Sequence, residues 1–143
     1  MIVVDTSAII AIWQEEPEWE LLLDRLYREP DDERSMSVAC FIEAGTVMAG
    51  RRLAGPADAL DELNKLLTRT NLRLVAVDEE QARLGLDARI RYGRGFGHPA
   101  KLNYGDCFSY ALAKTLNAPL LYVGNDFDRT DVRSALRKRK KKK

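Results

Sequence analysis

Short apolar runs alternate with longer amphipathic stretches along the chain. Ile2–Val4 is a β-branched run typical of a buried strand. "SMSV", "LRLVAV" and "PLLYV" predict three further strands, and "VRSAL" leaves a short fifth one open. The stretches between them predict helices: "TSAIIAIW", "EEPEWELLLDRLYRE", residues 38–52, residues 56–70, "DEEQARLGLDARIRYG" and "YGDCFSYALAKTLN". Strands that alternate with helices imply a parallel sheet covered by helices.

Two of the expected helices have apolar residues at helical spacing. We expect two sets of side chains to face the core: Trp19, Leu22, Leu23 and Leu26 in the first of these helices, and Leu60, Leu63 and Leu67 in the second.

The composition fits one domain with a single core. The chain has 143 residues, of which 45% are hydrophobic and 31% are charged. Its formal net charge is +1, but the last seven residues, "RKRKKKK", are all basic, so the remainder is net acidic. We therefore expect a domain over residues 1–136 and a disordered basic tail over residues 137–143, which either contacts nucleic acid or is simply solvated.

The two cysteines, Cys40 and Cys107, lack CxxC spacing and are flanked by apolar or aromatic residues. This pattern argues against a disulfide framework or a zinc site, and it favours buried free thiols in a reducing compartment. Asp5 interrupts the first apolar run, and no apolar stretch approaches the roughly 20 residues that span a bilayer. We expect a soluble protein of the cytoplasm.

Several acidic residues occur where a carboxylate is costly or well placed for chemistry. Asp5 follows the first strand and Asp126 follows the fourth, so both belong at the carboxyl edge of a parallel sheet, where ligands bind. Asp106 lies in the first turn of a helix, where it could also be an ordinary cap. Glu43 has mostly small or apolar helical neighbours; it either needs a cation or polar partner, or it lies at a helix edge facing water.

Carboxylates that converge repel one another unless a cation lies among them. Their oxygen atoms suit Mg²⁺ or Mn²⁺, whereas a single histidine and unpaired cysteines make zinc a poor fit. Divalent ions held by carboxylates serve phosphodiester chemistry, because they activate water and neutralise charge on the attacking and leaving oxygens. The sequence offers neither a nucleophile paired with a histidine base nor a phosphate-binding loop.

Four segments in this order resemble the PIN-domain ribonucleases, and more narrowly the VapC toxins of VapBC toxin–antitoxin modules. They are "IVVDTSAI", the small-residue helix around Glu43, "HPAKLNYGDCFSYALAK" and "LLYVGNDFDRTDV". The resemblance implies a PIN-like three-layer α/β/α sandwich, with a central, mostly parallel sheet of four to five strands and acidic residues at its carboxyl edge. The polybasic end is not part of the family's pattern.

The resemblance also implies a site. It assigns metal binding most directly to Asp5 and Asp106, and it assigns Glu43 and Asp126 to the remaining catalytic acids, bound directly or through water. Further residues would support these ligands: Thr6 as the hydroxyl beside the first acid, Asn103, and Asp131, which could instead brace the last turn.

The activity that the resemblance implies is Mg²⁺- or Mn²⁺-dependent endonucleolytic cleavage of RNA, inhibited by a cognate VapB-like antitoxin. Activated water would attack phosphorus in line and leave a 5′-phosphate and a 3′-hydroxyl. The family also implies a homodimer, with the region of "IIAIW", Trp13 and Trp19 contributing to dimer and antitoxin contacts. Basic residues around the glycine-rich loop would contact RNA phosphates unless they form an ordinary solvated face: Arg89, Arg91, Arg94 and Lys101.

Two alternatives stay open from the residues alone. A haloacid-dehalogenase-like phosphatase also begins with an Asp after a strand, but it needs an acid two residues later, where this chain has Ser7. A metal-free module that binds nucleic acid through its basic tail is the other alternative. His98, the only histidine, is expected to brace its loop before Pro99 rather than to touch RNA.

Overall fold

The computed structural model describes residues 1–51 and 55–136 of the chain. The expected basic tail, residues 137–143, lies outside the described residues, as does the end of the helix that was expected to reach residue 52.

Four parallel strands form the central sheet, in the order β3-β2-β1-β4. Val3 pairs with Leu120 on one side of β1, and Ile2 pairs with Arg34 on the other. The expected fifth strand is reduced to one parallel bridge between Leu120 and Ser134. The strands are β1 (Ile2–Val4), β2 (Arg34–Ser37), β3 (Arg73–Val75) and β4 (Leu120–Leu121).

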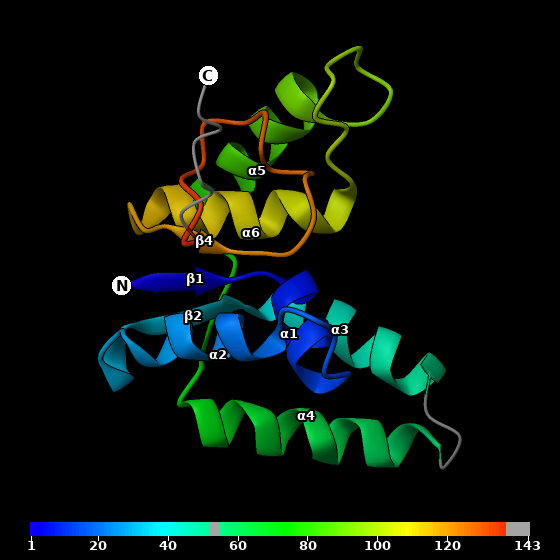
Figure 1. The fold of residues 1–143 in the computed structure, drawn as a ribbon. Helices are drawn as coiled ribbons and strands as arrows, with labels where there is room; N and C mark the ends of the chain where they lie inside the picture. The colour runs from blue at the N-terminus through cyan, green and yellow to red at the C-terminus, as the bar shows by residue number, and fades with distance from the viewer. Residues whose placement is uncertain (52–54, 137–143) are drawn as a thin grey trace.

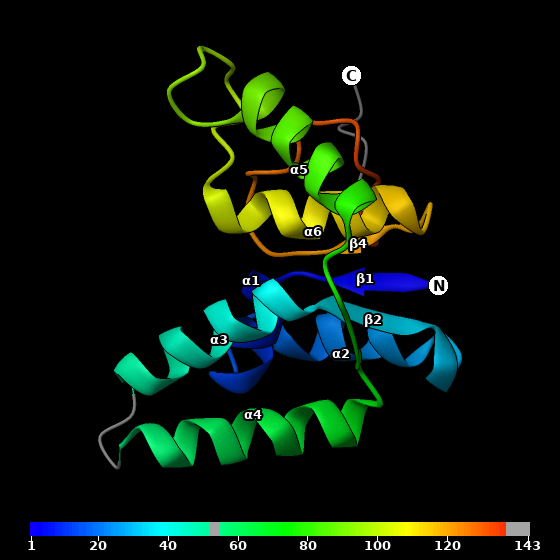
Figure 2. The same cartoon turned by 180° about the vertical axis from the view of Figure 1, so that it is seen from behind.

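Helices cover both faces of this sheet, which confirms the three-layer arrangement (Figure 1; Figure 2). One face carries α5 (Glu79–Tyr92) and α6 (Tyr104–Thr115). The other face carries α1 (Thr6–Trp13), α2 (Trp19–Tyr27) and α3 (Val38–Arg51), with α4 (Pro56–Thr70) packed on α3 at the outside; a single 3-10 turn, Asp31–Glu33, leads into β2.

The helix faces expected from the sequence are mostly those that pack inward. In α2, Leu22 and Leu26 are fully buried, while Trp19 and Leu23 are half-buried beside them. In α4, Leu63 and Leu67 are buried, but the expectation for Leu60 is wrong because its side chain is 53% exposed. The buried apolar residues of α4 are Ala59, Leu63, Leu66 and Leu67, whose spacing centres the apolar face one residue before Leu60.

The apolar segment "IIAIW" forms core rather than an exposed contact surface. Ile9, Ile10 and Ile12 are buried in the cluster between the sheet and α3. Trp13 is half-buried and donates its indole N–H to Glu62 at 3.0 Å. Trp13 and Trp19 line a hollow of about 550 Å³ between α1, α2 and α4, together with Ile12 and Tyr27, so this part of the region does border a surface depression.

Both cysteines are buried free thiols, as the sequence predicts. Among the described residues, no helix combines the length and the apolar character needed to cross a membrane.

Candidate active site

Asp5 lies where β1 ends and α1 begins, and it is only 3% exposed. It is the N-cap of α1, because its Oδ2 accepts the backbone N–H of Ser7 at 3.0 Å. Oδ2 also accepts the Ser7 hydroxyl at 2.6 Å, and Oδ1 accepts the Ser109 hydroxyl from α6 at 2.5 Å. These bonds fix the orientation of the carboxylate.

Asp106 is both a helix cap and a buried acid. It completes a capping box at the start of α6: Asn103 Oδ1 accepts the Asp106 N–H at 2.8 Å, and Asp106 Oδ2 accepts the Asn103 N–H at 3.0 Å. Burial raises the pKa of Asp106 to about 7, and the charge of Asp5 adds to that rise. The bond from Asn103 opposes the rise, whereas the charges of Asp126 and Glu43 increase it further.

Glu43 projects from α3 onto the first turn of α6. A Cβ added at Gly105 would overlap both carboxylate oxygens of Glu43, so the acid lies directly against that glycine. The positive end of the α6 dipole favours a carboxylate there. The sequence left open whether Glu43 faces water at a helix edge; its half-buried side chain instead meets the segment that carries Asp106.

Asp126 is exposed, in the loop that follows β4. Gly124 permits the turn into this loop because its φ is +90°, a value that L side chains rarely adopt. Asp5, Glu43 and Asp126 therefore all act on Asp106 electrostatically, although they come from separate segments. Within the described part of the chain, no three His, Cys, Asp or Glu side chains are close enough together to hold one ion by themselves.

The supporting residues expected from the sequence have distinct positions. Asn103 holds Asp106 through the capping box. Thr6 is buried, but its hydroxyl donates to the Cys40 carbonyl at 3.3 Å and so ties α1 to α3. Asp131 accepts the Tyr110 hydroxyl at 2.6 Å and pairs with Lys114 at 3.0 Å, so it braces α6 against the C-terminal loop.

Reasoning from the sequence missed the two hydroxyls that hold Asp5. Ser7 could have been found, because a residue two positions after an N-cap commonly bonds to it. Its Oγ also accepts the Val123 N–H at 3.0 Å, which joins Asp5 to the segment after β4. Ser109 lies one helical turn after Asp106 and is fully buried, so its spacing was the available signal.

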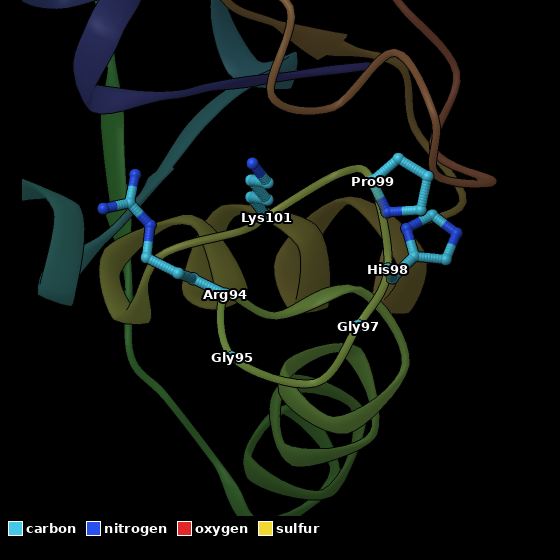
Figure 3. Close-up of a pocket in the computed structure, with 6 residues that line it drawn as sticks. All are labelled: Arg94, Gly95, Gly97, His98, Pro99 and Lys101. Atoms are coloured by element: carbon cyan, nitrogen blue, oxygen red, sulfur yellow. The ribbon is translucent and has the colours of Figure 1, made fainter.

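The basic residues expected to contact RNA fall into two groups. Arg89 donates to the Leu102 carbonyl at 3.2 Å, and Arg91 pairs with Asp87 at 3.1 Å. Arg89 thus holds the loop against α5, whereas the Arg91 ion pair lies within α5. Arg94 and Lys101 are exposed and border a hollow of about 660 Å³ in the loop, from which both project on the same side (Figure 3).

His98 braces this loop, as expected. Its Nδ1 accepts the Ala100 N–H at 3.0 Å, and its ring packs edge-on against Tyr92 with centroids 5.0 Å apart. In Figure 3 its ring lies at the other end of the hollow from Arg94.

Comparison with known proteins agrees with this arrangement. Residues 2–133 match the PIN domain. The chain is a PIN-domain protein of the VapC family. It is 44% identical to Ribonuclease VapC28 of Mycobacterium tuberculosis over 137 residues, and this alignment covers 96% of this chain and 99% of that protein. It is 46% identical over 130 residues to Ribonuclease VapC of Mycolicibacterium smegmatis, covering 91% and 96%.

Solved structures share the PIN fold at low sequence identity. The sarcin-ricin loop cleaving toxin VapC20 of Mycobacterium tuberculosis matches with a TM-score of 0.70 at 16% identity, over 92% of this chain and 96% of that one. A chain of a toxin–antitoxin complex from Klebsiella pneumoniae matches with a TM-score of 0.68 at 15% identity, over 92% and 93%. The family match removes the haloacid-dehalogenase alternative, in agreement with Ser7 occupying the position where that chemistry needs an acid.

The acid cluster of this PIN domain fits a hard divalent cation. Its donors are carboxylate oxygens, and the pKa of Asp106 is raised by burial and by the charges of Asp5, Asp126 and Glu43.

Proposed function

We propose that this VapC protein is a toxin that cleaves RNA endonucleolytically with Mg²⁺ or Mn²⁺. The observation that carries the proposal is the buried Asp106, whose pKa is raised by burial and by carboxylates from three other segments. A folded protein does not gather such repelling groups for stability, so the cluster points to a bound cation. The family membership supports RNA as the substrate, since the curated relatives are ribonucleases.

In this proposal Asp5 and Asp106 bind the ion directly, and Glu43 and Asp126 act directly or through water. Ser7 and Ser109 hold Asp5 in a single orientation, just as Asn103 holds Asp106. A bound ion would activate water for in-line attack on phosphorus and neutralise charge on the leaving oxygen. With the 3′ oxygen as the leaving group, this attack would give a 5′-phosphate and a 3′-hydroxyl.

Arg94 and Lys101 are the proposed phosphate contacts, because both are exposed and neither takes part in the ion pairs among the described residues. Such contacts position RNA without reading its sequence. Arg89 acts through the loop that it holds, and Arg91 is paired with Asp87 on α5.

We further propose a cognate VapB-like antitoxin and a homodimer, both in the cytoplasm. The hollow bordered by Trp13 and Trp19 offers a site for an apolar antitoxin segment. Leu86 and Ile90, which are 62% and 53% exposed on α5, support a contact with a second copy.

Substitution of the two central acids tests the enzymatic proposal. Asp5→Asn and Asp106→Asn keep the side-chain size and one of the two oxygens but remove the negative charge, whereas Asp24→Asn on the exposed face of α2 is the matched control. We expect the parent and the control to cleave RNA with Mg²⁺ and to stop when the ion is chelated, and both site variants to lose cleavage. Cleavage by Asp106→Asn at the parental rate would refute the proposal. Binding of RNA by all variants without any cleavage would support the non-catalytic module instead.

A further inference from the structure

A hollow of about 490 Å³ lies against the acid cluster, between α3 and the start of α6. Its volume lies in the range of sites that hold small organic groups. It shares Glu43 and Gly105 with the catalytic cluster, and Asn103, which caps the helix that carries Asp106, also borders it. The residues that carry the argument below are Ile42, Glu43, Asn103, Tyr104, Gly105 and Phe108.

The outer wall of this hollow is apolar and open to solvent. Ile42 on α3 is 67% exposed, and Tyr104, the first residue of α6, is 72% exposed. The Tyr104 ring meets Phe108 edge to face, with centroids 5.0 Å apart and planes at 85°. Phe108 thus holds the tyrosine ring in place without covering it, and neither exposed side chain adds much to the buried core.

The charge around the hollow selects what can occupy it. Glu43 is the one charged side chain among the described residues that line this hollow, so its wall offers no cation to a phosphate, and the exposed cations Arg94 and Lys101 border the separate loop hollow. The base is the flat, uncharged part of a nucleotide, and aromatic side chains stack on bases of any sequence. An RNA base in this hollow would lie next to the acids, so its nucleotide would be at the cleavage point.

We propose that this hollow holds one unpaired RNA base beside the cleaved phosphodiester, stacked on Tyr104 and flanked by Ile42. The inference rests on the proposed function, since it deepens the substrate site of that nuclease. A base inside a duplex cannot enter the hollow, so cleavage occurs where the RNA is single-stranded or looped.

The test uses a short single-stranded RNA with one 2-aminopurine, whose fluorescence falls when the base stacks. Binding is measured on the full chain carrying Asp106→Asn, so that no cleavage occurs during titration. Adding Tyr104→Ala should weaken binding about ten- to hundred-fold and abolish the quenching, whereas Tyr104→Phe should stay within about two-fold. Tyr27→Ala, an exposed tyrosine on α2 in the opposite layer, is the matched control and should change neither.

The outcomes separate this site from the nuclease itself. If the parent cleaves RNA but Tyr104→Ala binds and quenches as before, the base site is refuted and the nuclease stands. If no protein cleaves yet quenching depends on Tyr104, the base site stands and the nuclease fails. Conversion of a dimer into a monomer by Tyr104→Ala, measured by light scattering, would show that a second copy covers the hollow and would overturn the proposal.

Discussion

Replacing Gly105 with alanine should have different effects on the stability of the protein and on its activity. Gly105 lies in the first turn of α6 with ordinary helical backbone, so alanine suits the helix and stabilises it by up to about 1 kcal/mol. The added Cβ, however, overlaps the Glu43 carboxylate. Ordinary contact requires the carboxylate to retreat by about 1 Å or more.

The two consequences can be given magnitudes. The flexible Glu43 side chain can turn away, so the free energy of unfolding of Gly105→Ala should differ from that of the parent by no more than about 1 kcal/mol. A displacement of about 1 Å in an active site can cost about a hundred-fold in rate, so RNA cleavage with Mg²⁺ should fall by about that factor. Chemical denaturation and a cleavage time course measure the two quantities on the same sample.

Gly50→Ala is the matched control, since Gly50 lies on the same helix as Glu43 and an added Cβ meets nothing within 4 Å. It should cleave like the parent. If the effect of Gly105→Ala acts through Glu43, it should vanish in a Glu43→Ala background, because effects through one group are not additive. Parental cleavage by Gly105→Ala would refute the reasoning that the position of Glu43 matters.

Three further predictions concern the same cluster. In buffer without divalent ions, folded Asp106 keeps its proton up to about pH 7, while the unfolded residue loses it near 3.8. The free energy of unfolding should therefore fall by at most about 4 kcal/mol as pH rises through that window. Denaturation of Asp106→Asn at several pH values should lack this slope. Saturating Mg²⁺ or Mn²⁺ at neutral pH should raise the melting temperature, with a gain of about 3 kcal/mol at a hundred times the dissociation constant, and an equal gain in Asp5→Asn would place the ion elsewhere. Ser109→Ala removes the donor to Asp5 Oδ1, so stability should drop by about 1–3 kcal/mol with at least ten-fold slower cleavage, whereas Thr46→Ala on the exposed face of α3 should leave the cleavage rate unchanged.

The order and type of the elements could be predicted from the sequence because local patterns determine them. Strands of β-branched residues and helices with apolar faces alternate clearly, and strand ends place Asp5 and Asp126 at one edge without any knowledge of the tertiary contacts. The error at Leu60 shows where this stops. Its spacing fits a helical face, but which side of α4 meets α3 depends on the packing partner.

Only part of the contacts in the site could be predicted from the sequence. Ser109 holds Asp5 across a separation of 104 residues, and no local pattern encodes that contact. The arginines of α5 cannot be told apart by charge in the sequence, yet the Arg89 side chain donates a hydrogen bond to the Leu102 carbonyl of the loop that follows α5. Asp106 does cap α6, and the charges of the other acids act on the same carboxylate, but its role as a metal ligand stays a prediction.

The position of β1 inside the sheet constrains how the protein is made. The partner of β1 on one side, β4, lies more than 110 residues later, and α6 brings Asp106 and Ser109 to Asp5 over almost the same separation. During translation the first strand therefore leaves the ribosome with an unpaired edge, and the carboxylates stay apart until the last third of the chain has emerged. An incomplete product therefore lacks the assembled acid cluster.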